Sequence, residues 1–249
     1  MESLGIDIGS RTIKSVLLSD GEIQEWEVVE PTSRPAETAR RFLAKYGSIP
    51  VVATGYGRNL LEIEDVPSVT EIKACARGIR HYSTDACTIL DIGGQDLKAI
   101  QLDASGRIAK FEMNDRCAAG TGQFLEIMAD KLGFPVADFG SAAQNGAAGI
   151  SISPVCTVFA ESEVIGLLNK GTPPNDIALA VHQSVVKKIA GMYKRLSTSN
   201  DTVHIVGGGA MNTCVKELLE DELLVKVHVP ANPQIVVALG AAVIASQGT

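Results

Sequence analysis

Apolar and polar residues follow the same order along two separate stretches of the chain. Residues 4–18 and 88–102 each contain an apolar run, the sequence Asp-Ile-Gly, a polar turn and a second apolar run. Short apolar runs interrupted by glycine turns are typical of paired β-strands. An alternating segment follows each pair, at 22–30 and 107–114. The pattern therefore predicts a duplicated unit of three strands.

The remaining segments combine buried strands with helical periodicity. Residues 49–54 and 202–206 are apolar strands that enter glycine loops, and 225–230 has the pattern of a further short strand. Apolar spacing and helix-forming composition predict helices at residues 35–46, about 119–132, 160–170, 175–196, 213–223 and 233–247. Strands that alternate with helices in this way predict an α/β fold.

Composition supports a globular α/β protein with two domains. The chain has 249 residues, of which 45% are hydrophobic and 20% charged, so it can bury a core without disulfides. The two halves place one domain at 1–84 plus 231–249 and the other at 85–230. We expect neither a nucleic-acid nor a membrane partner, since the net charge is −7 and no long basic or apolar run occurs. Five scattered cysteines are typical of thiols in a reducing cytoplasm.

Three glycine-rich strand ends are candidates for a ligand site. They lie at residues 7–9, 91–94 and 207–209. In open α/β folds, ligands bind beside the carboxyl ends of strands, so these ends are expected to converge. Glycines there would allow phosphate oxygens to approach backbone N–H groups without interference from a Cβ atom.

Charged side chains accompany the first two strand ends. Asp7 and Asp91 would supply carboxylates for Mg²⁺, which is usually held by one or two carboxylates with phosphates and waters. Lys14 can reach the phosphates from the returning strand. Lys98 approximately repeats the position of Lys14, and the alternative is a solvated strand residue.

The order of these motifs resembles that of the actin, heat-shock ATPase and sugar kinase superfamily, and no Walker A motif occurs. The resemblance implies two ribonuclease-H-like domains with an ATP cleft between them. It places a first phosphate loop at 5–14, a second at 91–98 and an adenosine loop at 206–212. The nucleotide-binding residues that we expect are Gly9, Ser10, Arg11, Thr12, Lys14, Gly93, Gly94, Gly120, Gly207, Gly208, Gly209, Ala210 and Asn212.

Two of the five cysteines stand in loops just before predicted helices. Cys117 and Cys156 have small or polar neighbours, whereas Cys75, Cys87 and Cys214 fit small buried hydrophobic residues. The positive end of a helix dipole would stabilise a thiolate or an anionic metal cluster. Structural zinc and cubane iron–sulfur sites need four ligands, and a two-fold dimer would supply the second pair.

Four segments together resemble one branch of this superfamily closely. They are ATGYGRN (53–59), DIGGQD (91–96), NDRCAAGTGQFL (114–125) and CTVFAESEVI (156–165). The segments resemble the activator ATPases (component A) of 2-hydroxyacyl-CoA dehydratases. That family also includes ATP-hydrolysing subunits of benzoyl-CoA reductases and reductases of double-cubane cluster proteins. The resemblance spans nearly the whole chain.

This resemblance implies an ATPase that transfers single low-potential electrons to an iron–sulfur acceptor enzyme. Cys117 and Cys156 of two identical subunits would hold one 4Fe-4S cluster, with ferredoxin or flavodoxin as electron donor. The implied cofactors also include ATP/ADP and Mg²⁺, with Asp7 and Asp91 as the catalytic carboxylates. We expect a hinge in which ATP closes the two halves and the helices after both cysteines rotate.

Gln95 is the first candidate for positioning the attacking water, because an amide can align water without competing as a base. Asp96 is the second candidate, and a turn-capping carboxylate is its alternative. Glu161 and Glu163 have either a nucleotide role or a helix-start role. The residues without an assigned role are Arg58 and Asn59, and the residues interpreted as structural are His81, His182, His204 and His228.

Two other functions remain open from the residues. A small-molecule kinase, of the sugar or pantothenate type, would use the same ATP site and leave both cysteines as ordinary thiols. An ATP-regulated filament or scaffold protein would polymerise and carry no iron. Iron content in anaerobically purified protein separates both alternatives from the activator.

Overall fold

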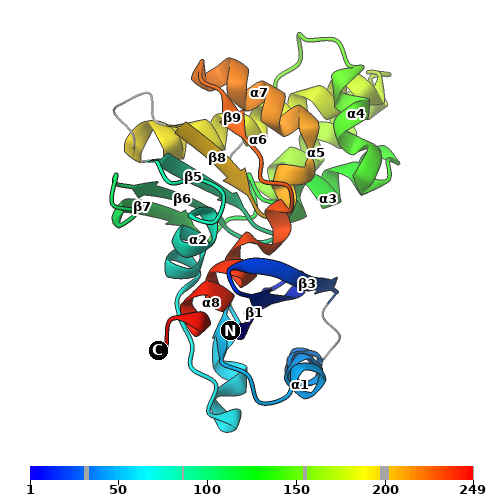
Figure 1. Ribbon diagram of the computed structural model, residues 1–249. Helices are drawn as coiled ribbons and strands as arrows, with labels where there is room; N and C mark the ends of the chain where they lie inside the picture. The colour runs from blue at the N-terminus through cyan, green and yellow to red at the C-terminus, as the bar shows by residue number, and fades with distance from the viewer. Residues whose placement is uncertain (31–33, 86, 154–155, 197–201, 249) are drawn as a thin grey trace. The chain divides into compact units, whose positions relative to one another are not determined.

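The computed structural model describes residues 1–30, 34–85, 87–153, 156–196 and 202–248 (Figure 1). The chain forms two compact units. The first unit consists of Met1–Ala86, Leu102–Ala109 and Ala231–Thr249, and the second of Cys87–Gln101 and Lys110–Pro230. Within the part of the chain that is described, no helix is both long enough and apolar enough to cross a membrane.

The first unit is built on a four-stranded sheet. Its strands are β1 (Glu2–Ile8), β2 (Ile13–Ser19), β3 (Glu22–Val29) and β4 (Val51–Thr54), in the order β3-β2-β1-β4. β1 pairs antiparallel with β2 and parallel with β4. All of β1 after its first residue is buried, so both faces of this strand are covered.

Helices cover both faces of this sheet. Alternate β1 residues Leu4 and Ile6 pack with Phe42 of α1 (Pro35–Tyr46) in one core cluster. The opposite face of β1 receives α8 (Val236–Ser246), because Gly5 has no side chain to separate the two backbones. α8 also packs tightly on α2, which spans Glu71–Ile79. Two short 3₁₀ helices complete the unit, η1 (Arg58–Glu64) and η4 (Pro233–Ile235).

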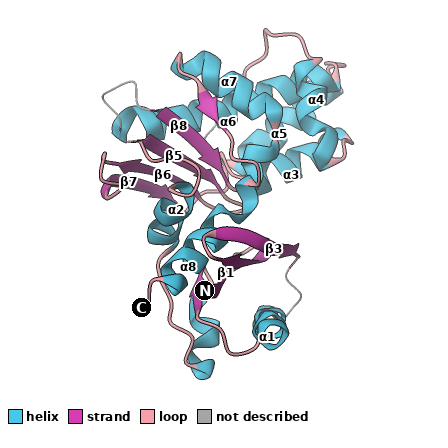
Figure 2. Cartoon of the chain, in the orientation of Figure 1, coloured by secondary structure: helices cyan, strands magenta, loops and turns pink. Residues whose placement is uncertain are grey.

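The second unit repeats the strand order and adds one strand. Its sheet has the order β7-β6-β5-β8-β9. One face of the sheet is covered by a helical layer whose buried side chains form one large core cluster with the strands (Figure 2). The elements are β5 (Cys87–Ile92), β6 (Leu97–Leu102), β7 (Ile108–Asn114), α3 (Gly122–Leu132), η2 (Val136–Asp138), α4 (Phe139–Gln144), α5 (Thr157–Asn169), α6 (Pro174–Leu196), β8 (Thr202–Val206), η3 (Gly208–Met211), α7 (Thr213–Leu223) and β9 (Val227–His228).

Several boundaries differ from those that the sequence predicts. α3 begins at Gly122 rather than near residue 119, because the preceding segment turns at Gly120, whose φ is +91°. α5 begins at Thr157 rather than 160, so Cys156 is its N-cap residue. The strand expected at 225–230 is reduced to two residues of β9, and α4 was not predicted.

Candidate functional site

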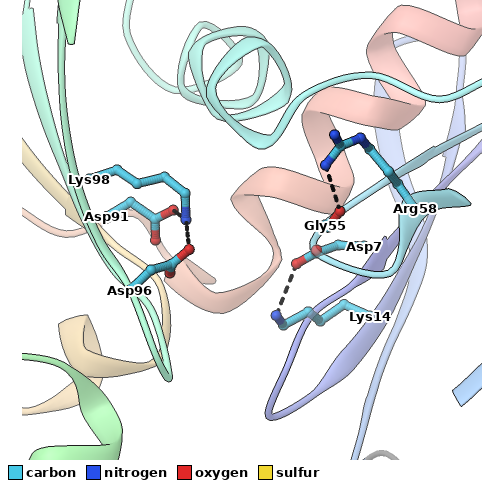
Figure 3. A network of polar contacts seen from close by, with 7 residues as sticks. All are labelled: Asp7, Lys14, Gly55, Arg58, Asp91, Asp96 and Lys98. Carbon is cyan, nitrogen blue, oxygen red and sulfur yellow. Dashed lines mark hydrogen bonds and ion pairs between the residues drawn. The ribbon is translucent and has the colours of Figure 1, made fainter. Parts of the chain in front are cut away.

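An aspartate–lysine pair lies at the end of β1. Asp7 is opposite Lys14 in the register of the β1–β2 hairpin, and Lys14 Nζ donates to Asp7 Oδ2 over 2.9 Å (Figure 3). Between them the chain makes a tight turn, in which the Gly9 N–H donates to the Thr12 carbonyl oxygen at 3.1 Å. Asp7 is buried and Lys14 is half-buried, so the sequence places a charge pair at the inner edge of this turn.

The loop after β4 fixes the other side of Asp7. Gly55 has φ +96°, and a Cβ atom there would lie 2.6 Å from Asp7 Oδ1 and 2.5 Å from the Ile8 carbonyl oxygen. The Arg58 guanidinium donates to the Gly55 carbonyl oxygen at 3.3 Å (Figure 3). Glycine is therefore required at position 55, for both its backbone conformation and the close approach to the carboxylate.

A second aspartate–lysine cluster lies at the end of β5. Lys98 Nζ is 3.6 Å from Asp91 Oδ2 and 2.7 Å from Asp96 Oδ2 (Figure 3). The side chain of Lys98 is only 3% exposed, so its interpretation as a solvated strand residue is wrong. A buried ammonium group requires a nearby negative charge, and here it has two. Asp96, the second candidate for positioning the attacking water, forms this ion pair with Lys98.

The loop after β8 repeats the geometry of the loop after β4. Gly207 has φ +83°, and a Cβ atom there would lie 2.6 Å from Asp91 Oδ1 and 2.5 Å from the Ile92 carbonyl oxygen. Those are the distances found at Gly55 relative to Asp7 and its neighbour. Each unit therefore places a glycine loop against the carboxylate of its own aspartate. The duplication extends beyond the hairpins from which it was inferred.

The second phosphate-loop candidate is joined to the start of α3. The N–H groups of Gly122 and Gln123 donate to the carbonyl oxygens of Gly93 and Gly94, at 2.9 and 2.8 Å. These N–H groups belong to the first turn of α3, which therefore holds the turn after β5 directly. The expectation that Cys117 immediately precedes a helix is wrong, since four residues separate it from Gly122.

Cys117 and Cys156 differ from the other cysteines in exposure. Both are half-buried, whereas Cys75, Cys87 and Cys214 are buried as expected, and no disulfide joins any of the five. Burial raises the pKa of the Cys214 thiol to about 11, which makes it a poor thiolate donor. Cys156 is the N-cap residue of α5 and makes no side-chain capping hydrogen bond.

Two glutamates near Cys156 have structural partners. Glu161 forms an ion pair with Lys131 of α3 at 2.7 Å, and Glu163 accepts the N–H of Ser153 at 2.9 Å. These contacts bind α5 to α3 and to the segment that precedes it. Neither glutamate needs a nucleotide role to explain its position.

The other predicted nucleotide residues lie in turns or in the packing around them. Gly120 is buried, and a Cβ atom there would be 3.2 Å from Lys188 Cγ of α6. The side chain of Asn212 caps α7, because its Oδ1 atom accepts the Val215 N–H at 3.2 Å. The exposed residues of the predicted set are Ser10, Arg11, Gln95 and Gly208, while Gly209 and Ala210 are buried.

The sequence interpretation left Gly55 out of the site and kept two alternatives open for Lys98. Gly55 had a detectable signal, because the spacing of GYG after β4 matches that of GGG after β8. Among the described residues, no three His, Cys, Asp or Glu side chains gather as a metal site. Each aspartate is instead brought together with a lysine.

This fold and its duplicated aspartate–glycine loops define an actin-like ATPase. A glucokinase of the ROK family from Streptomyces griseus shares the fold, with a TM-score of 0.65 at 12% identity over all of both chains. The sequence profile of the BadF/BadG/BcrA/BcrD ATPase family matches residues 4–245, and the chain belongs to this family. This match confirms the family that the four sequence segments indicated. It also confirms the prediction that the chain is an ATPase and binds ATP.

Relatives within the family are similar over their whole length. A 2-hydroxyisocaproyl-CoA dehydratase activator of Clostridioides difficile is 39% identical, covering 98% of this chain and 95% of its own. An activator of lactoyl-CoA dehydratase of Anaerotignum propionicum is 41% identical, covering 98% and 97%. The solved structure of the activator of the 2-hydroxyisocaproyl-CoA dehydratase from Clostridium difficile, with bound ADPNP, has a TM-score of 0.89 at 38% identity and covers 99% and 95%.

Proposed function

We propose that this chain is an ATP-dependent reductive activator of an iron–sulfur enzyme of the 2-hydroxyacyl-CoA dehydratase type. ATP hydrolysis would drive single low-potential electrons from a cluster held by two copies of the chain to the acceptor. The observation that carries the proposal is full-length similarity to named activators at about 40% identity. Ferredoxin or flavodoxin would supply the electrons, and a benzoyl-CoA reductase-like or double-cubane protein is an alternative acceptor.

The two aspartate–lysine clusters are our candidates for binding the triphosphate and its magnesium ion. Carboxylates suit Mg²⁺, which takes few protein ligands and completes its shell with phosphates and waters. Asp7 and Asp91 fit this role, since each stands at a glycine turn with Lys14 or Lys98 beside it. The lysines would offset charge on the phosphates as point charges.

Gln95 is our preferred residue for orienting the attacking water. It is exposed at the turn between β5 and β6, next to Gly94. Asp96 is less suited, because its carboxylate forms the 2.7 Å ion pair with Lys98. A neutral amide can align water by hydrogen bonds, as glutamine does in other nucleotide hydrolases.

Cys117 and Cys156 are our candidates for the cluster ligands. Thiolates are the ligands that iron–sulfur clusters use, and these two cysteines are the less buried ones in the chain. One chain offers two of the four ligands that a cubane needs, so a symmetric homodimer is part of the proposal. When bound, such a cluster supplies one electron at low potential. Cys156 would present its thiolate at the first turn of α5, where the helix dipole favours negative charge.

A direct structural connection supports coupling between the nucleotide and the cysteine segment. Gly122 and Gln123 hold the carbonyl oxygens of Gly93 and Gly94, and the chain between Cys117 and Gly122 is only one short turn. A nucleotide that moves the glycine turn would therefore move the start of α3. The hinge between the two units would act on the cysteine segment through this contact.

The test is anaerobic purification with measurement of iron, sulfide, subunit mass and ATPase activity. We expect a brown homodimer with about four irons per dimer, as a cubane requires. Cys117→Ala and Cys156→Ala should each lose the iron and keep measurable ATP binding. Cys75→Ala is the matched control, since Cys75 is fully buried, and should keep the iron.

Two outcomes would contradict the proposal. Iron that follows Cys75 instead of Cys117 would refute the ligand assignment. A colourless ATPase, even after reconstitution with iron and sulfide, would refute electron transfer altogether. In that case phosphorylation of a small molecule would favour the kinase alternative, for which the shared fold is the present support.

A further inference from the structure

The histidine at position 182 is fully buried in the middle of α6 and has two defined partners. Its Nδ1 lies 2.8 Å from the carbonyl oxygen of Ala178, one helical turn earlier. A carbonyl oxygen only accepts hydrogen bonds, so Nδ1 carries the hydrogen. Burial lowers the pKa of His182 to about 4, so the ring is neutral at pH 7. Its Nε2 atom is therefore a hydrogen-bond acceptor.

The second partner belongs to the adenosine-loop candidate. Asn212 Nδ2 lies 2.9 Å from His182 Nε2 and donates to it. The other end of the amide, Oδ1, accepts the Val215 N–H and caps α7. Both ends of the Asn212 side chain are thus fixed. Its backbone N–H donates to the Gly209 carbonyl oxygen at 3.2 Å, which joins the fixed residue to η3.

A third helix closes this arrangement. The Phe139 ring of α4 lies against His182, with ring centroids 4.7 Å apart. At Gly140, a Cβ atom would come within 2.7 Å of Asn212 Oδ1, so α4 packs directly on the amide. α4, α6 and α7 contact one another in the helical layer of the second unit (Figure 1). The loop that ends at Asn212 is consequently held by three helices.

We infer that His182 is a positioning residue for nucleotide binding, acting through Asn212 to place the loop 207–211 against the adenosine part of the ligand. This inference rests on the proposed nucleotide role of that loop. It also changes the expected role of Asn212, because both ends of its side-chain amide are bonded to other residues of the protein. The residue contributes to binding by fixing the loop, and its side-chain amide does not recognise the base.

The test compares two ligands that share phosphates but differ in the nucleoside. Dissociation constants are measured by calorimetry for Mg-ADP and for magnesium tripolyphosphate, at pH 8. His182→Leu removes the acceptor and should weaken ADP binding about five- to tenfold, the worth of one hydrogen bond, with tripolyphosphate binding unchanged. His182→Gln restores an acceptor and should recover most of the ADP affinity.

Two further variants keep the test decisive. Asn212→Ser retains an oxygen for the α7 cap but is too short to reach Nε2 and adds no charge beside the ring, so it should show the same selective loss even if His182→Leu folds poorly. Ser184→Ala is the matched control on α6, because Ser184 is also buried and its hydroxyl bonds only the Val181 carbonyl oxygen among the described contacts. It should leave both dissociation constants unchanged.

The outcomes separate this inference from the function on which it rests. Unchanged ADP affinity in both His182→Leu and Asn212→Ser would overturn the positioning role. Equal weakening of ADP and tripolyphosphate would also overturn it, since the effect would then be general to the unit. A wild-type chain that binds neither ADP nor tripolyphosphate would overturn the nucleotide assignment itself.

Discussion

Replacing Gly207 by alanine tests whether the loop after β8 holds Asp91 in the position that the proposed magnesium role requires. Gly207 has φ +83° and ψ 180°, a region that side-chain-bearing residues rarely adopt. Such backbone strain costs about 1–3 kcal/mol. The new Cβ atom would also lie 2.5 Å from the Ile92 carbonyl oxygen and 2.6 Å from Asp91 Oδ1. Overpacking of this kind adds about 1–3 kcal/mol.

Gly47 provides the matched control. It has φ 68° and ψ −147°, close to the conformation of Gly207, but no atom lies within 4 Å of the position of its Cβ. Gly47→Ala should therefore incur the strain alone. We expect urea unfolding to show Gly207→Ala less stable than Gly47→Ala by about 1–3 kcal/mol, the steric part of the cost.

The functional readout is the rate of Mg-ATP hydrolysis. The Cβ of Gly207→Ala displaces the Asp91 carboxylate, and a misplacement of about 1 Å can cost about a hundredfold in rate. Gly47→Ala should hydrolyse ATP at the wild-type rate, because Gly47 is the C-cap residue of α1 and its new Cβ atom would meet no atom within 4 Å. Equal stability and equal activity in the two variants would refute the reasoning.

Three other perturbations have defined outcomes. His182 is neutral in the folded protein, because burial lowers its pKa to about 4, but it protonates near pH 6.5 when unfolded. The unfolded state therefore binds more protons below that pH, and His182 alone should lower the free energy of unfolding by about 2 kcal/mol between pH 7.5 and pH 5, in addition to the fall caused by His204, whose pKa burial also lowers to about 4. Urea titrations should show a fall that is smaller by the His182 contribution in His182→Gln. Lys98→Met leaves two carboxylates without their buried cation and should lower the free energy of unfolding by about 3–5 kcal/mol. Lys131→Met removes a half-exposed ion pair and should cost only about 0–1 kcal/mol. Equal shifts in Tm for the two variants would contradict the buried ion pair. Gly240→Ala places a Cβ atom 1.7 Å from a backbone carbonyl oxygen of α2 and should lower Tm. Gly191→Ala, whose Cβ atom would have no neighbour closer than 3.6 Å, should raise the free energy of unfolding by about 1 kcal/mol. Shifts of the same sign in the two variants would refute the close contact between α8 and α2.

Local pattern was sufficient to predict the strands and most helices, because the inner strands are rich in apolar residues and end at glycine turns, and the edge strands β3 and β7 alternate in polarity. The two Asp-Ile-Gly turns follow from glycine and apolar runs that lie within a few residues of each other. The start of α3 was predicted too early because the small residues at 118–122 carry no apolar periodicity that marks where the helix begins. Tertiary bonds from Gly122 and Gln123 to the glycine turn decide that boundary, and their partners lie about thirty residues away in the chain.

The chemistry of the site was harder to predict wherever it depends on burial. Lys98 alternates with apolar residues like an exposed strand position, yet the second face of this strand is also buried. His182 stands on an apolar helix face, where a structural role was the natural interpretation. The positioning role that we infer for it depends on Asn212, which is distant in sequence and near in space. No spacing rule indicates such a pair.

The second unit contains two separate connections between its proposed ligand sites. The first runs from the glycine turn at residues 93–94 to the start of α3, close to Cys117. The second runs through α6, which holds the adenosine-loop candidate by His182 and packs on Gly120 by Lys188. Under the proposed function, a nucleotide that contacts either loop would act on the segment that carries Cys117 from within one unit.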